Sequence, residues 1–417
     1  MCSSNNIFDR PVNRRGTNSM KHDTMPYADT IPLWVADMDF ETAPCVLSAL
    51  RQRLQHGCFG YTHVPDSYYR ATIDWFANRH HWHGIQQEWF IYTSGVVPAI
   101  SAIIKAMTTP GDKVLVQTPV YNCFFSSIRN NGCQIAEAPL SYATSEQGNG
   151  NDVYHRSHYY FIDYEAFEQA CADPDVKVFI LCNPHNPAGR VWSSEELRRM
   201  GEICKRHGVF VIADEIHCEF VNPRAKRDGY LAAYLHEEQI QYHPFMSISD
   251  APCAVCVSPS KGFNIAGLQI ANIIVPDAAI RQRIDKAINI NEVCDVNPFG
   301  VIALQAAYTD EGAQWIRSLC NYIYANYDFA KAYIEEHLPS WHVTTLEGTY
   351  LMWVDISQTG LTGEQMEQLL LDCAHVYVNA GNHYGTAAGN HFIRINLATQ
   401  RANLHTALER ICAIYNK

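Results

Sequence analysis

Residues 258–268 read SPSKGFNIAGL and place a lysine in an unusual setting. Small, hydroxylated and glycine residues surround Lys261, and the apolar stretch PCAVCV precedes it, so we expect the lysine just beyond the end of a strand. Taken alone, the stretch is also compatible with a surface loop that contains one lysine. A strand-end lysine can instead act as a nucleophile or a base, and that hypothesis requires partner groups elsewhere in the chain.

Three further stretches carry suitable groups to strand ends. YTSGVVPAI puts Gly95 at the start of a predicted helix, whose free N–H groups can bind phosphate. CNPHNPAGRV follows an apolar strand and directs the amide of Asn186 out of a tight turn. VFVIADEIHCEF ends a buried strand at Asp214, a carboxylate that needs a cation. The simpler alternatives are an ordinary glycine turn, a turn asparagine, and an ion pair with a core arginine.

Together, in this order along the chain, the four stretches supply what pyridoxal 5′-phosphate requires. The lysine forms the Schiff base, and the carboxylate keeps the pyridine nitrogen protonated. The amide donates to the phenolic oxygen, and the helix N-terminus holds the phosphate. A lysine on a pliable turn can then move between the cofactor aldehyde and the substrate.

The elements that must position these groups follow an alternating pattern from about residue 88 to residue 275. Short apolar runs alternate with helix-like segments such as VPAISAIIKAMTT and SSEELRRMGEICKRHG, the latter with a capping serine and acidic first turn. This pattern predicts an α/β fold with a mostly parallel sheet and ligands at the carboxyl ends of its strands. The expected strands are WFIYTS, KVLVQTP, QIAEAPL, VKVFILCN, VFVIADEI, CAVCVSPS and ANIIV.

The pattern changes after residue 297. Long helical stretches precede the short strands WHVTT, YLMWVD, VYVNA and HFIRINL, as in a smaller α+β domain. We therefore predict an N-terminal arm at 1–55 that contributes to the small domain, a large cofactor-binding domain at 56–297 and the small domain at 298–417. The polar stretches 141–158 and 222–244 are predicted surface insertions.

Composition narrows the function. The 417 residues carry a formal net charge of −12, which argues against binding to nucleic acid or an anionic membrane. No apolar run is long enough to span a bilayer, and the N-terminus lacks the apolar core of a signal peptide. The fifteen cysteines are scattered through apolar stretches, so we expect reduced thiols in a cytoplasmic protein.

No metal site is predicted. The Cys253-Ala-Val-Cys256 pair has metal-ligand spacing, but it lies in an expected strand and has no second pair. The histidines of the stretch 80–83 follow a helix-like segment, and we expect them at a solvated helix end.

Motifs along nearly the whole chain resemble those of fold-type I pyridoxal-phosphate enzymes of the class I/II aminotransferase superfamily. The closest resemblance is to the cystathionine β-lyase, or C–S lyase, branch. The motifs that carry it are WVADMDF, GYTHVPDSYY, TSGVVPAI, TPVYNCF, NPHNPAGR, ADEIHCEF, SPSKGFNIAGLQ, VNPFG and IRINLA.

The resemblance implies a role for each matching residue. Lys261 is the Schiff-base lysine and acid–base group, and Arg394 holds the substrate α-carboxylate as a bidentate pair. Ala36 lines the substrate side, and we expect Tyr350 to shape the entrance. The implied cofactor-binding residues are Gly95, Val96, Val97, Tyr121, Asn186, Asp214, His217, Ser258, Ser260 and Lys261. Tyr61 of GYTHVP is implied to reach the phosphate of a neighbouring subunit, which predicts a homodimer with shared sites.

Two positions depart from the aspartate aminotransferase pattern. His217 stands where that pattern has a tyrosine, as in the C–S lyase branch, and Gln269 replaces an arginine that contacts phosphate. Phosphate binding should then depend more on neutral donors.

The substrate is predicted to be a small amino acid, and the reaction depends on its β-carbon. Lys261 removes the Cα proton; a thiolate on the β-carbon then leaves, whereas without a leaving group the amino group is transferred. We favour β-elimination from cystathionine or related S-substituted cysteines, with an aminotransferase as the alternative. A cofactor-binding regulator should lack Lys261 or Arg394, or carry a DNA-binding domain, and the sequence has none of these features.

Overall fold

The computed structural model describes residues 6–143, 158–227, 235, 237, 239–292 and 295–415, and its centre is a seven-stranded sheet. In chain order the strands are β2 (Phe90–Thr93), β3 (Lys113–Val116), β4 (Gln134–Glu137), β7 (Val176–Cys182), β8 (Phe210–Asp214), β9 (Cys253–Val257) and β10 (Ala271–Ile274). They lie in the order β2-β10-β9-β8-β7-β3-β4, with β10 antiparallel to both neighbours and the other pairs parallel. The predicted α/β fold with a mostly parallel sheet is confirmed.

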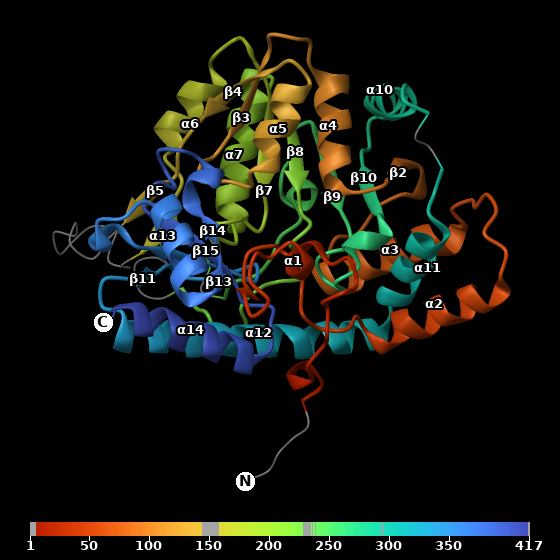
Figure 1. Cartoon of the computed structure of the whole chain (residues 1–417). Helices are drawn as coiled ribbons and strands as arrows, with labels where there is room; N and C mark the ends of the chain where they lie inside the picture. The colour runs from red at the N-terminus through yellow and green to blue at the C-terminus, as the bar shows by residue number, and fades with distance from the viewer. Residues whose placement is uncertain are drawn as a thin grey trace.

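Helices cover both faces of this sheet (Figure 1). The hydrophobic cores show which helices pack on which face: α4 (Val96–Met107), α5 (Cys123–Asn130) and α10 (Ala278–Asn289) on one, and α6 (Tyr164–Cys171), α7 (Ser194–His207) and α9 (Phe245–Ile248) on the other. Because every residue of β8 and β9 is buried, these strands read as continuous apolar runs. A capping box between Ser193 and Glu196 starts α7, as the sequence predicts.

A second, four-stranded sheet is antiparallel and lies in the order β11-β12-β15-β14. Its strands are β11 (His342–Val343), β12 (Leu351–Asp355), β14 (Asn379–Ala380) and β15 (Phe392–Asn396). The accompanying helices are α11 (Pro298–Ala307), α12 (Asp310–His337), α13 (Gly363–Leu369) and α14 (Arg401–Tyr415). Figure 1 shows α12 running along the base of the molecule, with α14 beside it.

The N-terminal segment connects the two parts. Its elements are β1 (Ile31–Pro32), α1 (Met20–Asp23), α2 (Pro44–His56) and α3 (Asp66–His80). Strand β1 pairs in parallel with β13 (Val376–Tyr377), so the predicted strand VYVNA divides between two sheets, as β13 and β14. The remaining elements are the hairpin of β5 (Ser141–Ala143) and β6 (Tyr159–Phe161) and the short helices η1 (Ile7–Asp9), η2 (Gln87–Trp89), η3 (Ala266–Leu268), η4 (Ser357–Thr359), η5 (Leu370–Ala374) and η6 (Gly381–Tyr384).

The prediction of a surface insertion at 222–244 is wrong for Asn222 and Arg227, which are buried. Arg227 has no exposed surface, and its Nε lies 3.0 Å from Oε1 of Glu347, whose Oε2 lies 2.9 Å from Nε of Arg190. Asn222 is buried as well. A polar run resembles a solvated loop in sequence, but here its arginine is neutralised by a carboxylate more than 100 residues away. Of the other polar stretch, residues 144–157 lie outside the described residues.

The predicted solvated helix end at residues 80–83 needs a similar correction. His81 and His83 are exposed, but His80 is buried and its Nε2 lies 2.9 Å from Oε1 of Glu219. Arg79 pairs with the other oxygen of Glu219. The acidic partner comes from the turn after β8, which sequence spacing could not indicate.

In the described part of the chain every cysteine is a free thiol, as expected from the sequence. Cys253 and Cys256 both lie in β9, as predicted, and pack in hydrophobic clusters on opposite faces of the sheet. Their sulfurs therefore cannot share one metal ion. Among the described helices, none combines the length and hydropathy needed to cross a bilayer.

Candidate active site

The carboxyl ends of β7, β8 and β9 open onto a cavity of about 190 Å³. Predicted site residues that line it are Ala36, Gly95, Val96, Val97, Tyr121, Asn186, Asp214, His217, Ser260 and Lys261. The sequence analysis did not single out the other lining residues, Ser94, Pro98, Cys182, Ile216 and Ala266. All five lie inside sequence stretches quoted above, so whole stretches indicate the cavity lining better than single residues do.

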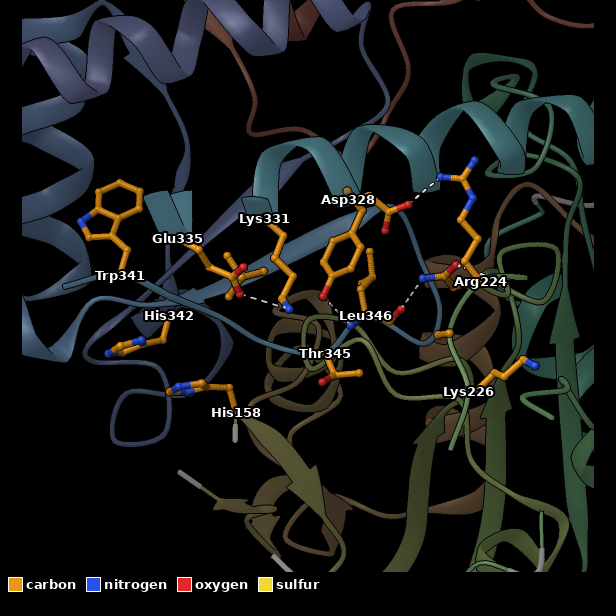
Figure 2. A pocket seen from close by; sticks show the side chains of 14 residues that line it. His158, Arg224, Lys226, Asp328, Lys331, Glu335, Trp341, His342, Thr345 and Leu346 are labelled. Atoms are coloured by element: carbon orange, nitrogen blue, oxygen red, sulfur yellow. Dashed lines mark hydrogen bonds and ion pairs between the residues drawn. The ribbon is translucent and has the colours of Figure 1, made fainter. Parts of the chain in front are cut away.

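A larger cavity of about 470 Å³ lies elsewhere, between α12 and the segments 222–226 and 341–346 (Figure 2). Four of its charged side chains form two pairs: Arg224 lies 2.6 Å from Asp328, and Lys331 lies 3.1 Å from Glu335. None of the predicted site residues lines it. Size alone therefore does not identify the site, and the strand-end cavity is the better candidate.

Lys261 extends from the turn after β9 into the cavity. Its Nζ donates a hydrogen bond to the carbonyl oxygen of Ala36. Burial, together with the positive charge of Arg394, lowers the pKa of the Lys261 amine to about 8, although Asp37 and Asp214 act in the opposite direction. About a tenth of this amine is then unprotonated at pH 7, far more than for an exposed lysine, as a base or nucleophile requires.

Asp214 ends β8 and faces the same cavity. Burial raises the pKa of its carboxyl to about 7, while the N–H of Ile216 (3.2 Å) and the charge of Lys261 oppose this rise. No arginine, lysine or histidine of the described residues forms a salt bridge with it, so the core arginine considered above is not its partner. The carboxylate is therefore available to a cationic group of a ligand.

His217 lines the cavity three residues after Asp214. Burial, with Lys261 and Arg394 nearby, holds the pKa of its imidazole well below the usual range, so the ring is neutral. Its ring packs edge-on at 5.6 Å from that of Tyr350, and its buried Nδ1 has no hydrogen-bond partner among the described residues. An unpaired buried nitrogen at a cavity wall is suited to a ligand.

The start of α4 also lines the cavity. The first backbone hydrogen bond of this helix runs from Ala99 N–H to Gly95 O at 3.0 Å, so the N–H groups of Val96 and Val97 have no partner within the helix. Such a terminus attracts anions.

Of Ser258, Ser260 and Gln269, only Ser260 lines the cavity at this anion site. Ser260 lines the cavity, whereas Ser258 lies behind it, with Oγ 2.8 Å from Ser260 Oγ and 2.5 Å from the carbonyl oxygen of Ile270. Gln269 is exposed and does not line the cavity.

Arg394 of β15 is buried beside Asn186. Its Nη1 donates to Oδ1 of Asn186 at 3.2 Å, its Nη2 donates to the carbonyl oxygen of Trp34 at 2.9 Å, and its guanidinium lies 4.7 Å from the ring centre of Tyr384. No described acidic residue pairs with it, and its buried Nε has no partner. The sequence offered no signal for Tyr384, because its ring reaches Arg394 from the separate short helix η6.

Of the remaining predicted residues, Tyr350 is buried next to the site and Tyr61 is exposed. Tyr350 is fully buried, and its hydroxyl donates to the carbonyl oxygen of Ala36 at 2.8 Å, the acceptor that Lys261 also uses. Tyr61 is 97% exposed and does not line the cavity of its own chain.

These groups form a chemically complementary set. The cavity presents a partly neutral amine, a carboxylate without a cation, free N–H groups at a helix start and, beside it, an arginine without an anion. Such a set can bind a ligand that is anionic at one end and cationic at the other, and can move a proton at an adjacent carbon.

Comparison with known proteins agrees with this geometry. Residues 28–411 match the family described as aminotransferase class I and II. The chain belongs to this family. Two relatives at or above 30% identity are Cystathionine beta-lyase PatB of Bacillus subtilis (strain 168), 38% identical over 97% of this chain and 99% of the relative, and Protein MalY of Escherichia coli (strain K12), 30% identical over 95% of each chain.

Solved structures of the family share the fold over nearly the whole chain. A PLP-bound putative aminotransferase from Clostridium difficile 630 has a TM-score of 0.87 and 38% identity, covering 97% of this chain and 98% of that one. The PLP-bound C-S lyase from Staphylococcus hominis has a TM-score of 0.83 and 31% identity, covering the same shares. The resemblance to the cystathionine β-lyase branch of the family, predicted from motifs, is confirmed.

Proposed function

We propose that this protein is a pyridoxal-phosphate-dependent carbon–sulfur β-lyase that cleaves L-cystathionine or related S-substituted cysteines to pyruvate, ammonia and a thiol. The observation that carries the proposal is the convergence of Lys261, Asp214 and the α4 N-terminus on one cavity at the strand ends. The names of the relatives favour a lyase over an aminotransferase.

The residues fit the cofactor. The buried Asp214 carboxylate lacks a cation among the described residues, and a protonated ring nitrogen would provide one. The free N–H groups of Val96 and Val97, with the hydroxyl of Ser260, would hold the phosphate. Tyr121 and Asn186 line the same cavity and would contact the ring and its phenolic oxygen.

When bound, pyridoxal phosphate supplies an aldehyde that takes up the amino group and a protonated ring that accepts the electron pair left at Cα. Arg394, whose Nε has no partner among the described residues, would hold the α-carboxylate of the substrate and thereby fix the amino acid in the site. The partly neutral Nζ of Lys261 takes the Cα proton. A thiolate on the β-carbon then departs with its bonding electrons.

The first test concerns the products. With cystathionine, the purified enzyme should release pyruvate, ammonia and homocysteine without any added keto acid, because the sulfur on the β-carbon is a leaving group. The amounts of pyruvate and of thiol released, measured in the same reaction, should be equal. L-Alanine, which has no leaving group, is the control and should give no more than one pyruvate per enzyme site in the same assay, because a single amino-group transfer is not turnover. Product that forms only when a keto acid is supplied would instead identify an aminotransferase.

We also propose that the enzyme is a homodimer in which Tyr61 contacts the phosphate in the neighbouring subunit. Tyr61 is 97% exposed and Phe59, two residues earlier, is 51% exposed, so the aromatic surface of these two side chains lies open in the single chain. The ring of Phe59 packs 5.6 Å from that of Phe299 at the start of α11, which extends this surface.

Mixed subunits test the shared site. Lys261→Ala and Tyr61→Phe homodimers should each be impaired. After subunit exchange about a quarter of the sites should regain activity, because half of the dimers are mixed and each has one site with neither change. Mixing each variant with itself through the same exchange procedure is the control. A mixture that is no more active than the sum of its parents would argue against a site shared between subunits.

Two further proposals concern organisation and location. We retain the division into an arm at 1–55, a large domain at 56–297 and a small domain at 298–417, which the separate seven-stranded and four-stranded sheets support. We propose a cytoplasmic enzyme, which the free thiols of the described residues support.

A further inference from the structure

Residues 34–38 of the N-terminal arm belong to no strand, yet each of their carbonyl oxygens accepts a hydrogen bond from a side chain. The donors include Arg394 at Trp34 (2.9 Å), Asn396 at Val35 and Asp37 (2.6 and 2.7 Å), Lys261 and Tyr350 at Ala36, and Asn264 at Met38 (3.0 Å). Because the segment pairs with no strand, its position depends largely on these side chains.

This segment accepts hydrogen bonds from two proposed site residues, Lys261 and Arg394, which follow or lie in strands of different sheets. Lys261 follows β9 of the seven-stranded sheet, whereas Arg394 lies in β15 of the four-stranded sheet. Their side chains donate to carbonyls only two residues apart, those of Ala36 and Trp34. The arm backbone therefore sets the separation between the amine and the guanidinium, a distance on which proton transfer at Cα depends.

Asn264, three residues after Lys261, holds the arm to the lysine turn. Its Oδ1 accepts from the N–H of Met38 at 3.0 Å, and its Nδ2 donates to the carbonyl oxygens of Met38 (3.0 Å) and Phe40 (2.9 Å). Its φ of 54° lies in the left-handed region, which asparagine and glycine tolerate better than other residues. One side chain thus fixes the turn that carries the lysine to the segment that receives its amine.

We propose that Asn264 is a positioning residue for Lys261, which keeps the Ala36 carbonyl where it orients the free lysine amine. This inference rests on the proposed function, in which Lys261 moves the Cα proton. A neutral amine has two N–H bonds and one lone pair; with one N–H directed to Ala36, the lone pair has fewer orientations and points more consistently to the substrate.

The test uses the holoenzyme with Asn264→Gly, because glycine adopts the same φ without strain. Two rates should fall together by about 10- to 100-fold: kcat for β-elimination, and loss of the Cα deuterium of L-[2-²H]alanine to solvent. KM for cystathionine should stay within about threefold, since Arg394 is untouched. Amide hydrogen exchange, followed by mass spectrometry, should become faster at residues 38–40, which Asn264 holds, and show that this part of the arm is released.

Asn396→Ala is the matched control, because it removes the two hydrogen bonds to Val35 and Asp37 but leaves the lysine turn intact. It should raise KM more than it lowers kcat, since Asn396 holds the arm beside Arg394. Asn264→Asp keeps the acceptor for Met38 N–H and loses both donors, so it should fall between wild type and Asn264→Gly; it also serves if the glycine variant does not fold.

The proposal is overturned if the arm is released in either Asn264 variant while kcat and deuterium loss stay at the wild-type level. It is equally overturned if the Asn264 and Asn396 variants change kcat and KM in the same ratio, which would indicate general loosening. Wild-type enzyme that exchanges the Cα deuterium but releases no pyruvate would refute the lyase and leave the test of Asn264 intact.

Discussion

Replacing Lys261 by alanine should leave the holoenzyme with no more than about one thousandth of the wild-type kcat for β-elimination. Both proposed tasks of this residue, attachment of the cofactor aldehyde and transfer of the Cα proton, need an amine. Among the described lysines, Lys261 is the one that lines the strand-end cavity. Burial lowers the pKa of this amine to about 8, so the wild-type base is partly neutral at the working pH.

Turnover of cystathionine, with cofactor occupancy measured on the same samples, checks this prediction. Borohydride reduction should fix the cofactor to Lys261 in the wild type and fix none in Lys261→Ala. The control is Lys331→Ala, which removes a lysine paired with Glu335 at the other cavity and should keep the wild-type rate (Figure 2). A borohydride label on a different lysine, or substantial turnover without Lys261, would contradict the assignment of the whole site.

The sheet was predictable because its strands carry their own signal. Each of the seven predicted runs became a strand of the central sheet. The signal is strongest in β7, β8 and β9, because parallel strands that are buried almost throughout are apolar along their length. VYVNA was less predictable: a five-residue run gives no sign that Val376–Tyr377 will pair with the arm and Asn379–Ala380 with β15. That division depends on partners elsewhere in the chain.

The candidate site was predictable at the level of motifs and less so at the level of contacts. Strand-end position brought Asp214 and Lys261 to one cavity, as expected of the carboxyl edge of a parallel sheet. The use of the Ala36 carbonyl by both Lys261 and Tyr350 was not visible, because backbone acceptors carry no residue signature. The buried partners of His80 and Arg227 were missed for a related reason: each contact joins segments more than 100 residues apart.

Asp214→Asn should lower kcat for β-elimination by about 100- to 1,000-fold and also weaken cofactor binding. The substitution keeps the shape of the side chain and removes its charge. Burial raises the pKa of the wild-type carboxyl to about 7, and a protonated ring nitrogen opposite it would favour the ionised form. An asparagine amide cannot balance that positive charge, so the ring nitrogen would lose its proton and the electron pair left at Cα would be poorly accepted.

The adjacent Glu215 provides a matched control for this prediction. It is also a buried carboxyl at the end of β8, but it is directed away from the cavity, to Tyr242, the N–H of Phe245 (2.7 Å) and Asn183. Burial raises the pKa of Glu215 to about 8, and its carboxyl does not line the cavity, so Glu215→Gln should keep kcat within about threefold of wild type. Initial rates at saturating cofactor, with the cofactor dissociation constant from equilibrium dialysis, would separate the two effects. Near-normal turnover in Asp214→Asn would refute the role of this carboxylate as counter-ion, whereas equal losses in both variants would show that any change at this strand end disturbs the site.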